Sequence, residues 1–367
     1  MPNAKSSKVN SLKRINALRK SAFTENGFDG YLIFNSANML YFLGFPGTSS
    51  LFIPADGESI VYVYGVNYEQ AKAEGKGFKV ELVKGDENLT EKIAKQAHEC
   101  KVKKLAVDAL NVEGYRTLSQ SFQKENAFEV NNSFVQALRK VKDKEEIELM
   151  RRAGELTSKG MNTALESVRS GAKEYEVAAE IEYAMRKRGS GGTAFGTIVA
   201  SGASSAFPHG GCTAREIRQG DLIVVDIGAT YQYYCSDMTR TFVAGKASTK
   251  QKHIYNLVRE AQENAFKNIK AEVSGSDVDA AARQTIKDAG FGDFFVHRLG
   301  HGVGLEVHEP PSLSQINKDE LAAGNVVTVE PGIYLPGYGG VRIEDTVLVQ
   351  KNGAQKLTVG SYSLGAE

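Results

Sequence analysis

The sequence predicts two domains, a small α/β domain followed by a larger α+β domain that carries an internal repeat. Three observations predict this. The chain has 367 residues, long enough for two hydrophobic cores. Its composition becomes strongly charged at residues 138–146, where we expect a linker and the first turn of a helix. Beyond that point one strand-like pattern occurs twice, at residues 220–228 and 324–332.

The overall charge balance argues against several classes of partner. The sequence has 45 basic and 44 acidic residues and a net charge of +1. A balanced chain without a long run of one sign predicts no nucleic-acid partner and no anionic membrane surface. The polar opening, residues 1–8, lacks the apolar core of a signal peptide, and no later segment has the length of a membrane span. We therefore expect a soluble cytoplasmic protein.

The three cysteines give no sign of a disulfide or a zinc site. Cys100, Cys212 and Cys235 are odd in number and lack the spacing of metal ligands. We assign all three to packing.

The first domain is expected to alternate short strands with helices. Apolar residues at Leu12, Ile15, Leu18 and Phe23 predict an amphipathic helix that ends at Gly27. This segment of the chain offers no glycine-rich phosphate loop and no cluster of ionisable residues. Strand-like runs follow at residues 31–34, 50–53, 59–64, 105–107 and 128–130.

The second domain begins with a clear helix signal. Asp143, followed three residues later by Glu146, has the pattern of a capping box, and an apolar stripe then leads towards Gly171. Further helices, bounded by glycine, are expected at residues 175–187, 250–270 and 276–289.

The repeat places acids at matched points of two strands. Each copy has a glycine, a largely β-branched run, an acid and a second glycine two positions later; the acids are Asp226 and Glu330. A second acid follows on each expected return strand, at Asp237 and Glu344, and a threonine stands two residues after it. A duplicated half-domain with pseudo-twofold symmetry would bring the four carboxylates into one central cleft.

Four unpaired carboxylates in such a cleft would repel one another, so cations must lie between them. Their charge of −4 balances two divalent ions, and His301 adds an imidazole nitrogen. Oxygen-rich sites with one imidazole suit Mn²⁺, Co²⁺ or Fe²⁺ and also admit Zn²⁺. Two ions about 3.5 to 4 Å apart would lower the pKa of a shared water towards neutrality, which is hydrolase chemistry.

His301 lies in a histidine-rich and glycine-rich stretch, residues 297–309, which holds three of the six histidines. In an extended chain His297 and His301 point to the same side, whereas His308 has the opposite parity and needs a turn to join them. Glycines at 300, 302 and 304 do not suit a helix interior. We expect these glycines to leave room for a peptide backbone and two ions.

Simpler explanations exist for each residue taken alone. A strand-end acid can cap a turn or pair with Arg240 or Arg342, and a histidine beside glycines can hydrogen-bond a neighbouring carbonyl. We expect a structural role for His98 and His253, which lie in helical contexts without companions. Four acids at matched positions together with His301 are not readily explained by packing alone.

Five motifs of the second domain carry a family resemblance. They are residues 226–228 (DIG), 236–241 (SDMTRT), 300–304 (GHGVG), 329–332 (VEPG) and 339–345 (GGVRIED). They resemble those of the pita-bread metallopeptidases, the family of methionine aminopeptidase, aminopeptidase P and prolidase. With the small α/β domain in front, the whole chain resembles the Xaa-Pro branch. The resemblance implies a creatinase-like α/β domain at residues 1–137 and a catalytic α+β pita-bread domain with a pseudo-twofold repeat at residues 138–367.

The resemblance also implies a metal-ligand set. The matching positions are Asp226, Asp237, His301, Glu330 and Glu344, with Asp237 and Glu344 expected to bridge two divalent ions. Glu330 is expected to shuttle protons as well as to bind metal.

Four further residues match substrate-facing positions. His308 matches the histidine that stabilises the oxyanion, and His209 matches one that lies over the substrate near the leaving nitrogen. His297 matches a histidine on the proline side of the cleft. Arg342 is similar to the arginine that supports a metal-bound acid.

The implied function is a two-metal exopeptidase that cleaves the bond between an N-terminal residue and proline, as a homodimer. An Xaa-Pro dipeptidase (prolidase) and an aminopeptidase P acting on longer peptides both fit. Some prolidases place an arginine soon after the His-Glu-x-Pro string to hold the dipeptide carboxylate, and residues 308–313 (HEPPSL) lack it. A metal-free creatinase-type hydrolase and a non-enzymatic binding protein share the fold, but the complete ligand set argues against both.

Overall fold

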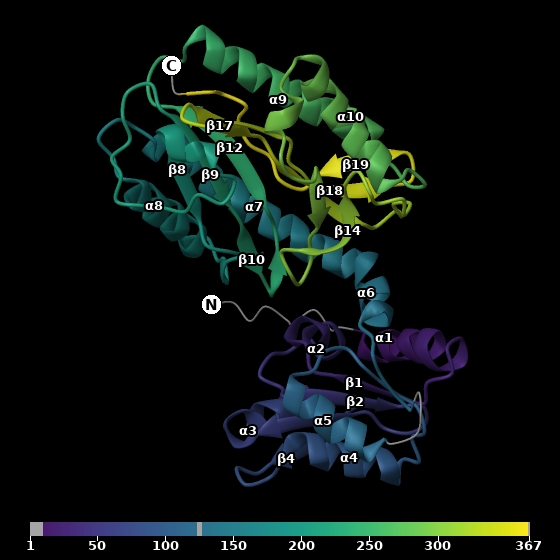
Figure 1. Cartoon of the computed structure of the whole chain (residues 1–367). Helices are drawn as coiled ribbons and strands as arrows, with labels where there is room; N and C mark the ends of the chain where they lie inside the picture. Colours follow the sequence, from purple (N-terminus) through teal and green to yellow (C-terminus); the bar gives the residue numbers. More distant parts are fainter. Residues whose placement is uncertain (1–9, 123–126, 366–367) are drawn as a thin grey trace. The chain divides into compact units, whose positions relative to one another are not determined.

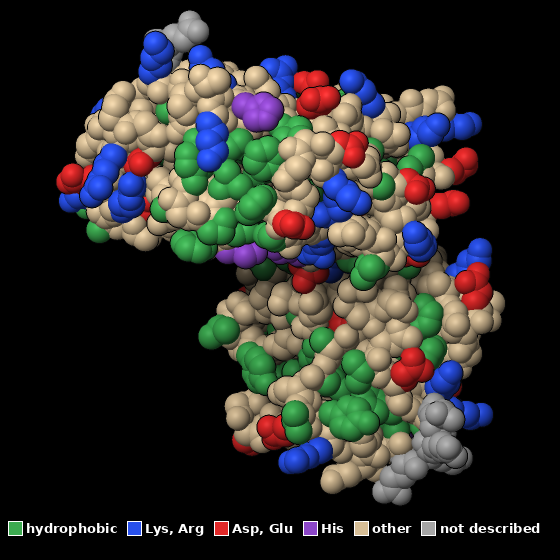
Figure 2. Space-filling view, turned by 45° about the horizontal axis from the view of Figure 1, so that its top comes forward, with side chains coloured by type: hydrophobic (Ala, Val, Ile, Leu, Met, Phe, Trp, Pro, Cys, Tyr) green, Lys and Arg blue, Asp and Glu red, His purple; other side chains and the backbone are tan. Residues whose placement is uncertain are grey.

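The computed structural model describes residues 10–122 and 127–365. The chain divides into two compact units, residues 1–139 and 140–367 (Figure 1). The polar opening at residues 1–8 lies outside the described residues. No helix of the described residues is long and apolar enough to cross a membrane. On the face shown in Figure 2, basic and acidic side chains are interspersed.

The first unit is built on one six-stranded sheet in the order β4-β3-β2-β1-β5-β6, with helices on both faces (Figure 1). β2 pairs antiparallel with β1 and β3, while the other neighbours pair in parallel. The strands are β1 (Gly30–Ile33), β2 (Ser50–Pro54), β3 (Ile60–Tyr64), β4 (Lys79–Val83), β5 (Leu105–Val107) and β6 (Phe128–Val130). The helices are α1 (Ser11–Leu18), the π-helix η1 (Arg19–Thr24), α2 (Ser36–Leu43), α3 (Gly65–Glu74), α4 (Leu89–Glu99), α5 (Val112–Ser121) and α6 (Ser133–Lys140).

These elements confirm the α/β prediction for the first domain, with one difference in the opening helix. Ile15 and Leu18 are buried as expected, but Leu12 is 68% exposed. The apolar stripe is therefore narrower than the sequence indicates. The helix continues as the π-helix η1, and Gly27 follows it with a φ of +72°.

The second unit consists of small twisted sheets with helices packed outside them. α7 and α8 pack against β8, β9 and β12, and α9 and α10 pack against β14 to β18. The helices are α7 (Lys144–Ser167), α8 (Glu174–Lys187), the 3-10 helix η2 (Gly202–Ala206), α9 (Thr249–Asn268), α10 (Gly275–Asp288) and the 3-10 helix η3 (Gly292–Phe294). The strands are β7 (Gly192–Thr193), β8 (Ile198–Ser201), β9 (Leu222–Ile227), β10 (Ala229–Tyr231), β11 (Tyr234–Cys235), β12 (Met238–Val243), β13 (Gly300–Gly302), β14 (Glu309–Leu313), β15 (Val326–Val329), β16 (Gly332–Leu335), β17 (Gly339–Arg342), β18 (Asp345–Gln350) and β19 (Gly353–Lys356).

The predicted helix signals are confirmed. Asp143 Oδ1 accepts the backbone N–H of Glu146 at 2.9 Å, and Glu146 Oε2 accepts that of Asp143 at 2.9 Å, which closes the capping box. The ends of α8, α9 and α10 lie within two residues of the expected ones.

The predicted repeat corresponds to two antiparallel strand pairs, β9 with β12 and β15 with β18. The starts of the second strands, β12 and β18, exchange two hydrogen bonds, one in each direction. The N–H of Asp237 donates to Thr346 Oγ1 at 3.0 Å, and the N–H of Glu344 donates to the carbonyl of Thr239 at 3.0 Å. This exchange is the pseudo-twofold contact between the halves.

The first strands of the two pairs, β9 and β15, do not align as the sequence repeat suggests: the strand ladders match Asp226 to Thr328, two residues before Glu330. Asp226 lies opposite Thr239 in the ladder, but the residue opposite Thr346 is Thr328, two positions before Glu330. Side chains alternate with a period of two along a strand, so this even offset leaves Glu330 on the face of its sheet that corresponds to the Asp226 face of the other sheet.

All three cysteines are free. Cys235 is buried and Cys212 is half-buried, but Cys100 is exposed at the end of α4. The packing role predicted for Cys100 is therefore wrong, because the last turn of that helix presents it to solvent.

Candidate functional site

One cavity of the second unit, of about 450 Å³, collects every site residue that the sequence predicts. Asp226 lies in β9, His301 in β13, and the other acids at strand ends: Asp237 before β12, Glu330 after β15 and Glu344 before β18. The residues that line the cavity are Phe195, Gly196, Ile198, Pro208, His209, Asp226, Asp237, His297, Arg298, His301, Val307, His308, Glu330, Arg342 and Glu344.

The densest group in this cavity has the composition of a metal site. One ligand atom each from Asp237, His301 and Glu344 lie within 4.8 Å of one another. His301 Nε2 is 3.8 Å from Asp237 Oδ2 and 3.3 Å from Glu330 Oε1. His301 Nδ1 lies 3.1 Å from the carbonyl oxygen of Gly302, a contact that aims Nε2 at the carboxylates.

The carboxylates keep buried oxygens free of protein donors. Asp226 Oδ1, Asp237 Oδ1 and Glu344 Oε1 are buried and have no hydrogen-bond partner within the described residues. Other oxygens of the same groups are held: Arg342 Nη2 donates to Asp226 Oδ2 at 2.6 Å, and Thr239 Oγ1 donates to Glu344 Oε2 at 2.6 Å. Buried polar atoms are normally satisfied, so these open oxygens fit bound cations.

Electrostatics support the same conclusion. Burial, and then the negative charges of Glu344, Asp226 and Glu330, raise the pKa of Asp237 well above its ordinary value. Burial, and then Glu330 and Asp226, do the same for the pKa of Glu344. Burial works against ionisation of Glu330 too, but a hydrogen bond from His301 and nearby positive charge hold the pKa of Glu330 at about 2. Cations are the natural counter-charge for such a group.

Arg342 supports the carboxylate cluster from behind. Its Nη2 pairs with Asp226, its Nε donates to Thr239 Oγ1 at 3.1 Å, and its Nη1 donates to the carbonyl of Pro208 at 3.1 Å and to the hydroxyl of Tyr334 at 3.0 Å. The ion pair between a strand-end acid and Arg342, which the sequence suggested as a simpler explanation, is thus formed by Asp226. The other oxygen of this carboxylate, Oδ1, has no hydrogen-bond partner among the described residues.

Tyr334 is a residue that sequence reasoning missed. Its hydroxyl lies 2.9 Å from His297 Nε2 and also accepts the hydrogen bond from Arg342. Burial raises the pKa of Tyr334 to about 12, so the hydroxyl stays protonated at neutral pH. No local signal marks Tyr334, because its partners come from other elements, Arg342 from β17 and His297 from the segment before β13.

The remaining histidines border the same cavity. The rings of His301 and His308 pack edge to face, with centroids 4.1 Å apart, so the turn between β13 and β14 supplies the change of side that the parity of His308 requires. Burial, and then the positive charges of His301 and Arg298, lower the pKa of His308. His209 is exposed on the rim.

The glycines of this stretch do not leave room for a substrate. A Cβ on Gly300 would lie 2.0 Å from the carbonyl oxygen of Thr328, and one on Gly302 would lie 2.4 Å from that of Glu309. A Cβ on Gly304 would lie 2.4 Å from Glu309 Oε1. The predicted role is wrong, because neighbouring protein atoms fill the space that a side chain would need.

Two histidines, His98 and His253, lie outside the cavity, and each has an aromatic neighbour. His98 stacks on Phe122 with centroids 4.9 Å apart, and His253 lies 6.3 Å from Phe291. Both are exposed helical residues, so their structural role stays a prediction.

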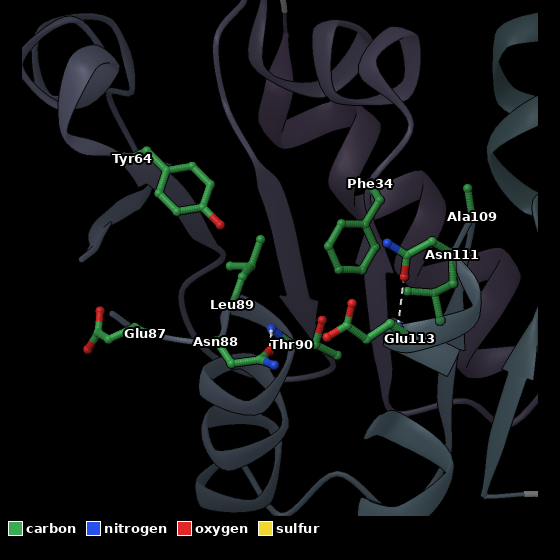
Figure 3. Close-up of a pocket in the computed structure, with 11 residues that line it drawn as sticks. Phe34, Tyr64, Glu87, Asn88, Leu89, Thr90, Ala109, Asn111 and Glu113 are labelled. Atoms are coloured by element: carbon green, nitrogen blue, oxygen red, sulfur yellow. Dashed lines mark hydrogen bonds between the residues drawn. The ribbon is translucent and has the colours of Figure 1, made fainter. Parts of the chain in front are cut away.

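A second cavity, of about 520 Å³, lies in the first unit at the ends of its strands (Figure 3). Its asparagines serve the helices: Asn88 Oδ1 accepts the N–H of Thr90 at 2.9 Å, and Asn111 Oδ1 accepts that of Gly114 at 2.7 Å. Within the described ranges, the one group that could hold a metal ion is in the second unit.

Comparison with known proteins gives the family. Residues 148–351 match the model of metallopeptidase family M24, and residues 14–141 match that of the creatinase/prolidase N-terminal domain. The chain is 43% identical to a Pyrococcus furiosus protein named Xaa-Pro dipeptidase, over 91% of this chain and 94% of that protein. Among solved structures it resembles an Xaa-Pro dipeptidase from Bacillus anthracis, with 37% identity, a TM-score of 0.91 and coverage of 97% and 99% of the two chains. It also resembles an X-Pro aminopeptidase from Thermotoga maritima, with 38% identity, a TM-score of 0.84 and coverage of 94% and 99%. The carboxylate-histidine cluster and the match over more than half of the chain lead to one conclusion: this protein belongs to metallopeptidase family M24.

Proposed function

We propose that the protein hydrolyses the peptide bond between an N-terminal residue and proline, acting as a two-metal exopeptidase on Xaa-Pro dipeptides. The observation that carries the proposal is the set of open carboxylate oxygens on Asp226, Asp237 and Glu344, beside His301 and Glu330 in one cavity. The relatives named Xaa-Pro dipeptidase support the choice of substrate.

The metal ligands in this proposal are Asp226, Asp237, His301, Glu330 and Glu344, and the cofactor is a pair of divalent ions of Mn, Co, Fe or Zn. Asp237 and Glu344 would be the ligands shared between the two ions, as the family resemblance implies, and both residues lie where the two halves of the repeat meet. When bound, such ions lower the pKa of water and neutralise charge that develops on the substrate carbonyl.

The side chains around the ligands carry out the proton transfers and the orientation. Glu330, whose Oε1 accepts a hydrogen bond from Thr328 Oγ1 at 3.1 Å, takes a proton from the attacking water and delivers it to the proline nitrogen as the carbon–nitrogen bond breaks. His308 donates a hydrogen bond to the carbonyl oxygen as it gains negative charge. His209 lies near the leaving nitrogen, and His297 borders the proline ring.

A second candidate function, cleavage of longer Xaa-Pro peptides, is favoured by one observation. Residues 308–313 lack the arginine that would hold a dipeptide carboxylate, and a relative at 38% identity is an X-Pro aminopeptidase. The test compares Leu-Pro with Leu-Pro-Gly after removal of metal by a chelator and reloading with Mn²⁺ or Co²⁺. We expect faster cleavage of Leu-Pro, and faster cleavage of the tripeptide would reverse the assignment.

Two controls complete this test. Leu-Gly, which lacks proline, is expected to remain intact. Activity that is indifferent to the chelator, with no metal found by elemental analysis, would favour the metal-free creatinase-type chemistry instead. A protein that cleaves no Xaa-Pro peptide when loaded with either metal would favour a binding protein.

We also propose a homodimer, by family analogy, and a location in the cytoplasm, because the sequence shows no signal-peptide pattern at residues 1–8. Light scattering coupled to size-exclusion chromatography tests the first. Fractionation of the source cells tests the second.

A further inference from the structure

A buried ion pair lies directly beside the proposed oxyanion histidine. Lys142 Nζ and Glu309 Oε1 are 2.7 Å apart, and their side chains are only 1% and 4% exposed. Glu309 is the residue after His308, while Lys142 precedes the helix α7 that opens at Lys144. The pair therefore joins the start of the second unit to the turn that carries His308.

Stability alone does not account for this pair. Removing two charges from water opposes folding, and a buried pair is often no more stabilising than apolar side chains of the same volume. In some proteins such a pair instead selects one geometry, because each buried charge is best compensated where the other one lies. The question is which atoms it fixes.

On the Glu309 side, the pair fixes the turn between β13 and β14. Glu309 Oε2 accepts the N–H of Glu306 at 3.3 Å, and the N–H of Gly304 donates to the carbonyl of Glu306 at 3.0 Å. Gly304 lies so close to the Glu309 carboxylate that a Cβ there would be 2.4 Å from Oε1. The turn thus closes around this carboxylate, with His308 as its last residue.

On the Lys142 side, the backbone is anchored to the loop before β15. The N–H of Lys142 donates to the carbonyl of Gly324 at 2.9 Å, and Asn325 Nδ2 donates to the carbonyl of Lys140 at 2.9 Å. The ammonium group is therefore presented from a fixed backbone. β15 is the strand that leads into Glu330, so one loop anchors both this lysine and a proposed metal ligand.

We infer that Lys142 is a positioning residue for the reaction, which holds the ring of His308 in place through Glu309. This inference rests on the proposed function for its catalytic consequence. It assigns to Lys142 no contact with the substrate or the metal ions.

A double-mutant cycle with His308 tests the inference. Lys142→Met in the metal-loaded full chain is expected to lower kcat/KM for Leu-Pro by about tenfold or more, mainly through kcat, because misplacement of a catalytic group by about 1 Å has effects of that order. In a His308→Ala background the same substitution is expected to cause no further loss. Equal losses in both backgrounds would overturn the inference, since general destabilisation acts without His308.

Lys140→Met is the matched control. It lies two residues away, and its pair with Asp319, at 3.9 Å, involves an acid that is 76% exposed. We expect unchanged kinetics from this variant. A loss as large as that of Lys142→Met would mean that any change in this segment impairs the enzyme, and would also overturn the inference.

A readout without catalysis separates this inference from the proposed function. Imidazole ¹⁵N signals of the metal-free protein, assigned by their absence in His308→Ala, report the ring directly. Lys142→Met is expected to shift or broaden the His308 signals, and Lys140→Met is expected to leave them unchanged. Unaltered His308 signals in Lys142→Met would refute the inference, whereas failure of the wild-type chain to cleave Leu-Pro would refute only the proposed function.

Glu309→Gln keeps the test decisive if Lys142→Met does not fold. The amide has the size of the carboxylate and retains an acceptor for Glu306, but it removes the charge that pairs with Lys142. A folded Glu309→Gln protein is expected to show the same kinetic loss and the same change in His308 signals. Wild-type behaviour in both measurements would overturn the inference.

Discussion

Replacing Asp237 by asparagine is expected to stabilise the metal-free protein while it removes the response to metal. The ligand atoms of Asp237 and Glu344 lie within 4.8 Å of each other. Two negative charges at that distance repel by about 3 kcal/mol at an effective dielectric constant of 20. Asparagine keeps the shape of the side chain and removes the charge, so the metal-free variant gains up to about that amount.

The wild-type protein should behave in the opposite way when metal is added. An ion at one hundred times its Kd stabilises the folded state by about 2.7 kcal/mol. For a unit the size of residues 140–367, that corresponds to a rise in melting midpoint of about 5 to 10 °C. The variant lacks one carboxylate of the proposed metal site, so its midpoint should hardly move.

The stabilisation of the metal-free protein by Asp237→Asn should depend on pH, and the direction follows from the pKa of Asp237. Burial and the neighbouring acids raise the pKa of Asp237 in the folded protein. The metal-free wild type therefore gains stability as pH falls through this raised pKa, and the gain is complete below the unfolded-state pKa of about 3.9. The advantage of Asp237→Asn should be largest at pH 8 and should shrink at pH 5.

Differential scanning fluorimetry of chelator-treated protein, with and without Mn²⁺ or Co²⁺ at both pH values, measures these shifts. Asp293→Asn is the control, because this acid is exposed and lies outside the cavity. A metal-free Asp237→Asn protein that melts below the wild type would refute the reasoning. So would a metal response as large as that of the wild type.

Three further outcomes follow from the site and its surroundings. Asp345 accepts from Arg240 Nη2 at 2.9 Å, and although burial opposes ionisation, Arg240 and a nearby lysine lower the pKa of Asp345. Asp345→Asn should therefore lower the free energy of unfolding by about 3 to 5 kcal/mol in urea titrations at pH 7. This loss should shrink as pH falls through the pKa of Asp345 in the folded protein. A loss that does not change with pH would contradict this. Arg298 is exposed and lines the cavity, whereas Arg342 in the same cavity is paired with Asp226. If Arg298 binds the dipeptide carboxylate, Arg298→Ala should raise KM for Leu-Pro about tenfold and leave KM for Leu-Pro-amide unchanged. Equal effects on both substrates would exclude that role. Tyr334→Phe should lower kcat/KM for Leu-Pro about tenfold, as expected for one lost hydrogen bond to His297, while elemental analysis finds unchanged metal content; metal loss would place Tyr334 in ligand support instead.

The features that the sequence predicts well are those with local signals. The capping box at Asp143 and Glu146 spans three residues, and its bonds form wherever the helix forms. The strands that carry Asp226 and Glu330 are marked by β-branched runs between glycines. Their convergence follows from the repeat, because equivalent strand ends meet at a twofold axis.

The features that the sequence does not predict depend on contacts between distant strands. The bond from Arg342 Nε to Thr239 joins residues 103 positions apart, and that from Lys142 to Glu309 joins residues 167 positions apart. The crowding at Gly300 also comes from another strand, since the nearest atom is the carbonyl oxygen of Thr328. The family resemblance indicates Arg342 as a supporting residue, but no periodicity or motif encodes its bond to Thr239 or the pair of Lys142 with Glu309, so these contacts appear only in the folded chain.

The metal site can form only when both halves of the repeat are present, because the hydrogen bonds between them bring its residues together. The first half supplies Asp226 and Asp237, whereas His301, Glu330 and Glu344 belong to the second. The bond from Asp237 to Thr346 spans 109 residues, so the centre forms only after both halves exist and have docked. During synthesis, a chain that has emerged only as far as α10 would hold two of the carboxylates and no histidine of the cluster. Metal loading would therefore be among the last events of folding, and bound metal would mark molecules in which the two halves have joined.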